Sequence, residues 1–128
     1  MNEMEKIFGF NAGKIWEFLE NEGGQVQTKI MKNANLTDEE FYGAIGWLAR
    51  ENKICKDKRT YKLGETNLTD QIGWNAGKVW EVLTSSSEID VSAIARKAKI
   101  PKQDCYTAIG WLAREGKITG KMMVKKKS

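Results

Sequence analysis

The sequence predicts a mainly helical fold with small β-hairpins (α+β), built twice in tandem within one chain of 128 residues. Three observations lead to this prediction. The octapeptide AIGWLARE occurs twice, and NAGKIWEFL matches NAGKVWEVL at the same separation of 64 positions. Apolar residues recur at helical spacing in both segments. Each half also ends in two short strand-like runs around a tight turn, which is typical of a β-hairpin.

The repeat sets the expected domain organisation. A shift of 64 positions aligns the two halves without a gap. We therefore expect two domains, a first copy over residues 1–64 and a second copy over residues 65–128, joined near the polar segment GETNLTD. Because this linker is short, the two copies should contact each other or nearly do so.

The first helix of each copy is predicted to begin at an asparagine. The side chains of Asn11 and Asn75 are suited to accept a hydrogen bond from an otherwise unpaired backbone N–H at a helix start. Phe10 and Trp74 precede these asparagines, and each would pack on an apolar residue of the new helix as a hydrophobic staple.

Capping signals also mark the second and third helices. A shorter second helix follows in each copy, and Asp90 is suited to cap the one in the second copy. Thr37 and Glu40 form a capping-box pattern at the start of the third helix of the first copy. Pro101 suits the first turn of its counterpart.

A hairpin closes each copy. Residues 54–63 and 118–124 each predict a strand, a tight turn and a second strand. With these residues and this order of elements, the chain resembles the winged helix-turn-helix superfamily. It is more closely similar to a small prokaryotic family of such domains, marked by AGKIW in the first helix and GWLARE at the end of the third. The resemblance covers almost the whole chain, once per copy, and implies DNA binding, with the third helix in the major groove and the hairpin wing on the phosphate backbone.

The third helix nevertheless lacks a reading face of the expected chemistry. Phe41, Ala44, Ile45 and Leu48 form its apolar stripe, so the sides and outer part of the helix carry Tyr42, Gly43, Gly46, Trp47 and Ala49 instead of base-reading polar residues. A glycine within a helix costs about 1 kcal/mol relative to alanine, and its usual justification is a neighbour that comes close.

We therefore expect these outer faces to be packing or partner surfaces. The residues concerned are Tyr42, Gly46, Trp47, Tyr106, Gly110 and Trp111. Their cover would come first from the same copy, then from the other copy or a second chain, and least from a stacked nucleic-acid base. Arg50 and Arg114 are expected to be structural and to pair locally with the adjacent Glu51 and Glu115.

Charge favours the second copy as a nucleic-acid surface. The first half holds ten basic and ten acidic residues, whereas the second holds eleven and seven, so the whole excess of four lies there. The third helix of the first copy begins with three acidic residues, which phosphates would repel. For each lysine, a solvated charge is as good an interpretation as a phosphate contact. The candidates for nucleic-acid contact are Lys56, Lys58, Arg59, Arg96, Lys97, Lys99, Lys102, Gln103, Lys121, Lys125, Lys126 and Lys127.

Composition excludes several other classes of protein. The chain has no histidine and only two distant cysteines, so we expect no metal site, no cofactor and two free thiols in a reducing cytoplasm. It has no apolar run long enough to span a membrane and no secretion signal at its N-terminus. A phosphate-binding loop and a nucleophile beside a base are also missing, so neither an enzyme nor a small-molecule substrate is expected.

Two functional hypotheses remain. The leading one is a DNA-binding transcription regulator whose two copies imitate a symmetric dimer and grip double-stranded DNA mainly through its phosphates. The alternative is a protein-interaction or scaffolding module that uses the same fold without reading DNA, through self-association or another protein on the faces of the third helices.

Overall fold

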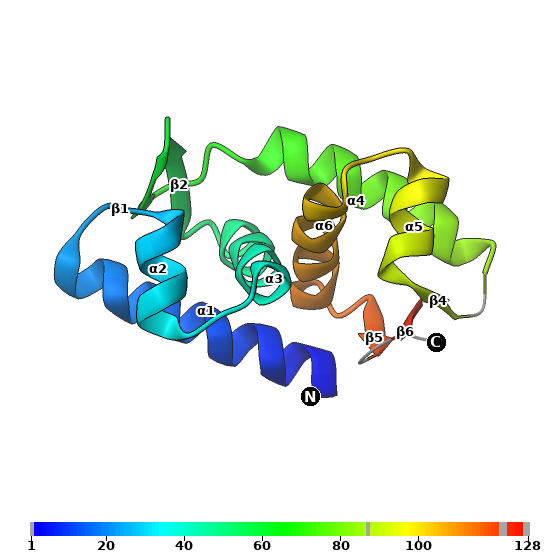
Figure 1. Ribbon diagram of the computed structural model, residues 1–128. Coiled ribbons are helices and arrows are strands. Elements are labelled where there is room, and N and C mark those ends of the chain that lie inside the picture. The colour runs from blue at the N-terminus through cyan, green and yellow to red at the C-terminus, as the bar shows by residue number, and fades with distance from the viewer. Residues whose placement is uncertain (1, 87, 121–122, 127–128) are drawn as a thin grey trace.

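The computed structural model describes residues 2–86, 88–120 and 123–126 of the chain. Figure 1 shows the helices and strands of these residues. In chain order they are α1 (Glu3–Glu22), β1 (Gln25–Val26), α2 (Gln27–Ala34), α3 (Asp38–Arg50), β2 (Ile54–Asp57), β3 (Thr60–Leu63), α4 (Thr69–Thr84), β4 (Ile89–Asp90), α5 (Val91–Ala98), α6 (Lys102–Arg114), β5 (Ile118–Gly120) and β6 (Met123–Lys126).

The same order of elements occurs in both halves, so the predicted tandem, mainly helical fold with β-hairpin wings is confirmed. Each half has a small antiparallel sheet, with strand orders β1-β3-β2 and β4-β6-β5. Both predicted hairpins are present, and the second extends two residues past its predicted end at Val124. The short strands β1 and β4 were not predicted, because two residues are too few to show an alternating pattern.

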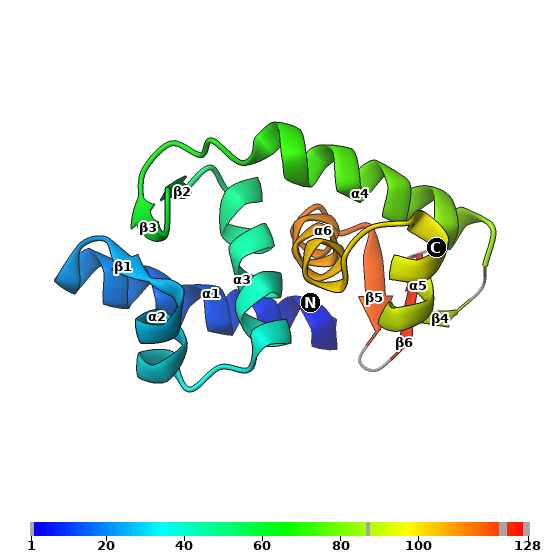
Figure 2. The same cartoon turned by 45° about the horizontal axis from the view of Figure 1, so that its top comes forward.

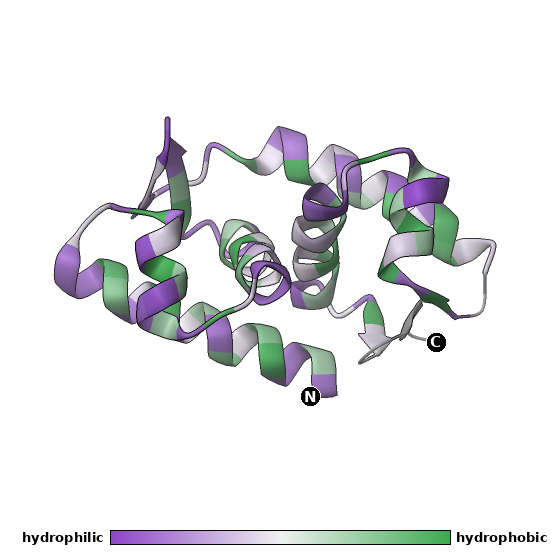
Figure 3. Ribbon diagram, viewed as in Figure 1, coloured by the Kyte–Doolittle hydropathy of each residue, from purple (hydrophilic) through white to green (hydrophobic). Residues whose placement is uncertain are grey.

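The two third helices lie side by side at the centre of the molecule. Figures 1 and 2 show α3 beside α6, with α1 and α4 outside them and the two small sheets at opposite ends. In Figure 3, α3 and α6 are mostly coloured as apolar or neutral beyond their hydrophilic first turns. The centre of the fold is therefore an interface between the two copies.

The copies also exchange the first turns of their long helices. Met4 of α1 is 5% exposed and belongs to the core of the second copy, together with Val79 and Ile94. In the opposite direction, Ile72 of α4 is 4% exposed and belongs to the core of the first copy. Each hydrophobic core is thus completed by a residue of the other copy.

This exchange explains why the predicted helix starts are wrong. Helix α1 begins at Glu3, and the Asn2 side chain caps it by accepting a 2.9 Å hydrogen bond from the backbone N–H of Glu5. Asn11 and Asn75 are instead buried in the middle of α1 and α4. The predicted staple residues Phe10 and Trp74 are 68% and 70% exposed. Burial of the upstream turns against the other copy extends both helices beyond their local capping signals.

The other capping predictions depend on local contacts and agree better with the structure. Thr37 and Glu40 form the capping box at the start of α3. Asp90 accepts a 2.8 Å hydrogen bond from the backbone N–H of Ala93 at the start of α5. Pro101 lies one position earlier than expected, at the N-cap of α6 rather than in its first turn. Local sequence therefore located these starts to within one residue.

Candidate nucleic-acid interface

Backbones meet directly where α3 crosses α6. A Cβ atom placed on Gly46 would overlap the carbonyl oxygen of Thr107, and one placed on Gly110 would overlap the carbonyl oxygen of Gly43. No side chain larger than hydrogen fits at either position without separating the helices. The repeated glycines are thus explained by the close approach of the two copies.

The repeated tryptophans pack at the same interface. Trp47 and Trp111 are half-buried, and each packs against the hydrophobic cores of both copies. The guanidinium carbon of Arg114 lies 5.5 Å from the centroid of the Trp47 ring, and Arg50 has the same relation to Trp111. Each ring therefore packs on its own copy and on the other copy.

Ion pairs cross the interface in both directions. Arg50 Nε lies 3.1 Å from Glu115 Oε2, and Arg114 Nε lies 3.0 Å from Glu51 Oε2. The expectation that each arginine pairs with the glutamate next to it in sequence is wrong. Adjacent residues at a helix end do not face each other, whereas the C-terminal ends of α3 and α6 bring each arginine to the other copy's glutamate.

The two tyrosines lie at the margins of the helix pair. The hydroxyl of Tyr42 accepts a 3.1 Å hydrogen bond from Nε2 of Gln27, within its own copy. Burial raises the pKa of Tyr106, and the carboxylate of Glu39 in the other copy adds to this effect. Together with the buried glycines and half-buried tryptophans, these contacts show that protein covers much of the outer faces of α3 and α6.

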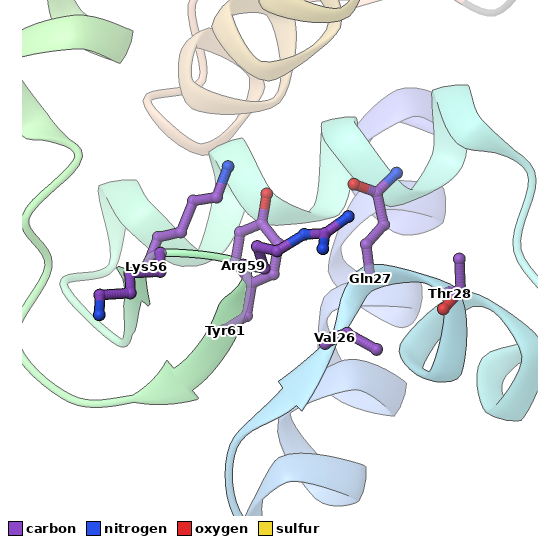
Figure 4. Close-up of a pocket in the computed structure, with 7 residues that line it drawn as sticks. Val26, Gln27, Thr28, Lys56, Arg59 and Tyr61 are labelled. Atoms are coloured by element: carbon purple, nitrogen blue, oxygen red, sulfur yellow. The ribbon is translucent and has the colours of Figure 1, made fainter.

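The clearest group of exposed cations lies on the first wing, the hairpin formed by β2 and β3. Lys56, Lys58 and Arg59 are exposed around a hollow of about 650 Å³ (Figure 4). The hollow is also lined by Val26, Gln27, Thr28 and Tyr61. The ammonium group of Lys56 lies 5.3 Å above the Tyr61 ring. The wing thus offers three exposed cations around a hollow whose lining includes the largely buried ring of Tyr61.

A second set of candidates lies on the second copy. Arg96 and Lys97 are exposed on α5, Lys99 is exposed at its C-cap, and Lys102 and Gln103 are exposed in the first turn of α6. Figures 1 and 2 show α5 and the first wing at opposite ends of the molecule, so the structure does not gather all the candidates into one cluster.

The remaining candidates are in the C-terminal segment. Lys121 and Lys127 lie outside the described residues. Lys125 and Lys126 belong to β6, but their side chains are also outside the described part of the structure. The candidate surface is therefore built here from the first wing, α5 and the start of α6.

A family model described as a winged helix-turn-helix domain, DUF2582, matches residues 1–64 and again residues 68–127. The chain belongs to this family. The match confirms the resemblance seen in the motifs and covers both copies of the DUF2582 chain. No curated protein and no solved structure shows a significant match.

Membership in a winged helix-turn-helix family supports DNA binding as a general role, and domains of this class are typically non-enzymatic. One fold can nevertheless serve different functions, so the function of this chain has to be inferred from the residues at its candidate site. Among the described residues, no three His, Cys, Asp or Glu side chains are grouped to hold a metal ion. No described helix is long and apolar enough to cross a membrane.

Sequence reasoning missed the residues that cross between the copies near the helix starts. Phe8 packs against the core of the second copy, and its ring fills the space where a Cβ of Gly43 would lie. The Asn2 side chain donates a 3.3 Å hydrogen bond to the carbonyl of Ile118. Apolar residues at positions 8 and 72, which match across the repeat, were the available signal that both helices begin earlier.

Proposed function

We propose that this protein binds double-stranded DNA through phosphate contacts made by exposed cations, without base readout by α3 or α6. The observation that carries the proposal is the packing of Gly46 and Gly110 against the backbone of the other copy, which covers the faces that would enter a major groove. The exposed cations of the first wing and of α5 remain accessible to a polyanion.

Electrostatics favour this mode of binding. The chain carries a net charge of +4, and Lys58 and Arg59 form no ion pair with any described residue. Phosphate contacts position a protein on a duplex but carry no sequence information directly. We therefore expect sequence-tolerant binding, and we propose that it serves transcription regulation in the cytoplasm.

The proposal is tested by titrating two unrelated duplexes at several salt concentrations and following fluorescence anisotropy. Similar affinities are expected for both duplexes, with a steep fall as salt rises. The double variant Lys58→Gln/Arg59→Gln should lower the slope of log K against log salt by about two, since each phosphate contact contributes about one. The matched control is Lys6→Gln/Lys32→Gln, which removes two exposed cations outside the first wing.

Two results would overturn the proposal. One is the absence of duplex binding at low salt. The other is a preference of about a thousandfold or more for one duplex, because discrimination of that size is typical of direct readout.

A protein-interaction module is the second candidate function. The large exposed rings of Phe10 and Trp74 favour it, because aromatic side chains are enriched at protein interfaces. This candidate predicts a defined complex in which one of these rings is buried, and it requires no salt-sensitive duplex binding.

A further inference from the structure

The outward side of α4 is an open helix face centred on an aromatic ring. Trp74 is 70% exposed, the largest exposed fraction among the large hydrophobic side chains of the described residues. A Cβ placed on Gly77 would meet no atom within 4 Å, so another helix can approach there. We define the α4 face as Asp70, Gln71, Trp74, Gly77, Lys78 and Glu81, of which only Lys78 is partly buried.

The charges on this face are complementary to themselves. Asp70 lies one turn before Trp74 and Lys78 one turn after it, so all three share one side of the helix. If two α4 helices crossed antiparallel at Trp74, Asp70 of each chain would lie opposite Lys78 of the other. Gln71 would lie opposite Gly77, where there is room for its side chain.

The equivalent face of α1 is not complementary to itself in charge. Phe10 occupies the position of Trp74, but Lys6 and Lys14 flank it in place of Asp70 and Lys78. An antiparallel pair of α1 helices would place lysine against lysine twice. A mixed antiparallel pair of α1 with α4 would place Lys6 against Lys78 but Lys14 against Asp70, so one repulsive contact would offset one attractive contact. Among these pairings, the charges favour only α4 with α4.

We propose that two chains associate through their α4 faces, as an antiparallel helix pair with a twofold axis at Trp74. Most of the gain comes from burial of the indole ring, while the two exposed ion pairs set orientation more than affinity. A contact limited to one helix face is smaller than a standard interface, so the expected dissociation constant lies between about 10 μM and 1 mM. This association needs no DNA and does not depend on the proposed function.

Sedimentation equilibrium of the full chain, without DNA, tests the proposal over loading concentrations up to about 1 mM. The mean mass should rise from one chain toward two. Trp74→Ala should weaken association about tenfold or more, in the range of an interface hot spot. Phe10→Ala is the matched control, because it removes an equally exposed ring from the α1 face and should leave association unchanged.

A charge exchange tests the orientation of the pair. Asp70→Lys and Lys78→Asp should each weaken association, because each places like charges opposite one another. The double variant carries both substitutions and should restore it, because opposite charges face again with their positions exchanged. Circular dichroism melts of every variant check that the fold persists, since Asp70 also stabilises the first turn of α4.

Three results would overturn the proposal. The first is a single-chain mass at all concentrations. The second is an equal effect of Trp74→Ala and Phe10→Ala on association. The third is a folded double variant in which association is not restored.

Discussion

The two copies differ most where they face away from each other. Their contact surfaces share the octapeptide AIGWLARE, whose arginines and glutamates form reciprocal ion pairs between the copies. Their wings are different: the first carries Lys56, Lys58 and Arg59 beside an uncapped start of α2, whereas in the second copy Asp90 caps α5. The shared octapeptide therefore holds the two copies together, whereas the surfaces that face away from the interface have diverged.

The hairpins show the same divergence in their backbone register. Ile54 pairs with Leu63 in the first wing, whereas Ile118 pairs with Lys126 in the second. The second hairpin is therefore one residue shorter between equivalent starting positions. A one-residue difference in a wing is tolerated because it leaves the α3–α6 contact intact.

We expect the largest loss of stability from a methyl group added where α3 crosses α6. Gly46→Ala should lower the free energy of unfolding by about 3 kcal/mol, because the new Cβ meets the backbone of Thr107, which has little freedom to move. Chemical denaturation measures this effect. The matched control, Gly77→Ala, adds the same group on an open helix face and should raise stability by up to about 1 kcal/mol. Equal effects of the two substitutions would refute the assignment of the glycines to close packing.

The exchange of first turns gives the next largest effect. Met4→Ala should cost about 2 kcal/mol or more, since the side chain is buried in the core of the second copy. Hydrogen exchange should show the loss of protection at Ile94 of α5, although the substitution lies in the first copy. Ile7→Ala, at a position that is 37% exposed, is the control. Loss of protection confined to α1 would contradict the exchange.

Alkaline pH should weaken both copies through different groups. Burial raises the pKa of Tyr61 in the first copy to about 12, and a nearby Tyr42 adds to the shift. Burial also raises the pKa of the Cys105 thiol in the second copy to about 12. Both groups hold their protons more tightly when folded. Their contributions are therefore complete below the unfolded pKa values of 10.0 and 9.0, and are lost as pH rises toward 12.

Thermal melts from pH 8 to pH 11 measure how much Tyr61 and Cys105 each contribute to the alkaline loss of stability. Tyr61→Phe and Cys105→Ala should each flatten the alkaline loss of stability relative to the unmodified chain, whatever their effect at neutral pH. An unchanged slope in both variants would show that neither buried group is responsible.

The smallest effect concerns the ion pairs between the copies. A double-mutant cycle with Arg50→Ala and Glu115→Ala should give a coupling energy below about 1 kcal/mol, because the Arg50 side chain is 44% exposed. The cycle with Arg50→Ala and Glu51→Ala should give less, since these neighbours form no ion pair in the structure. A larger coupling energy in the second cycle would instead support the pairing of Arg50 with Glu51 that the sequence predicts.

Local signals in the sequence were sufficient for much of the fold. Thr37 and Glu40 satisfy each other's backbone groups within four residues, so the start of α3 could be predicted without knowing its neighbours. The start of α1 could not, because Met4 is buried by residues more than seventy positions away. Asn11, an asparagine with good capping chemistry, was then mistaken for the start of a helix that already runs through it.

The candidate site was likewise only partly predictable from the sequence. Exposure of Lys58 and Arg59 follows from their place in a polar hairpin turn, so sequence was enough to propose them. The burial of Gly46 and Trp47 against the other copy depends on how two domains dock. A repeated glycine indicated a close neighbour but carried no information on which neighbour it was.

The linker between the copies gives the pairing of α3 with α6 a property that two separate chains would lack. Only residues 64–68 separate β3 from α4. A tether of this length holds the second copy at an effective concentration in the millimolar range beside the first. Association of the halves is consequently insensitive to dilution, and every molecule contains one copy of each kind in fixed stoichiometry.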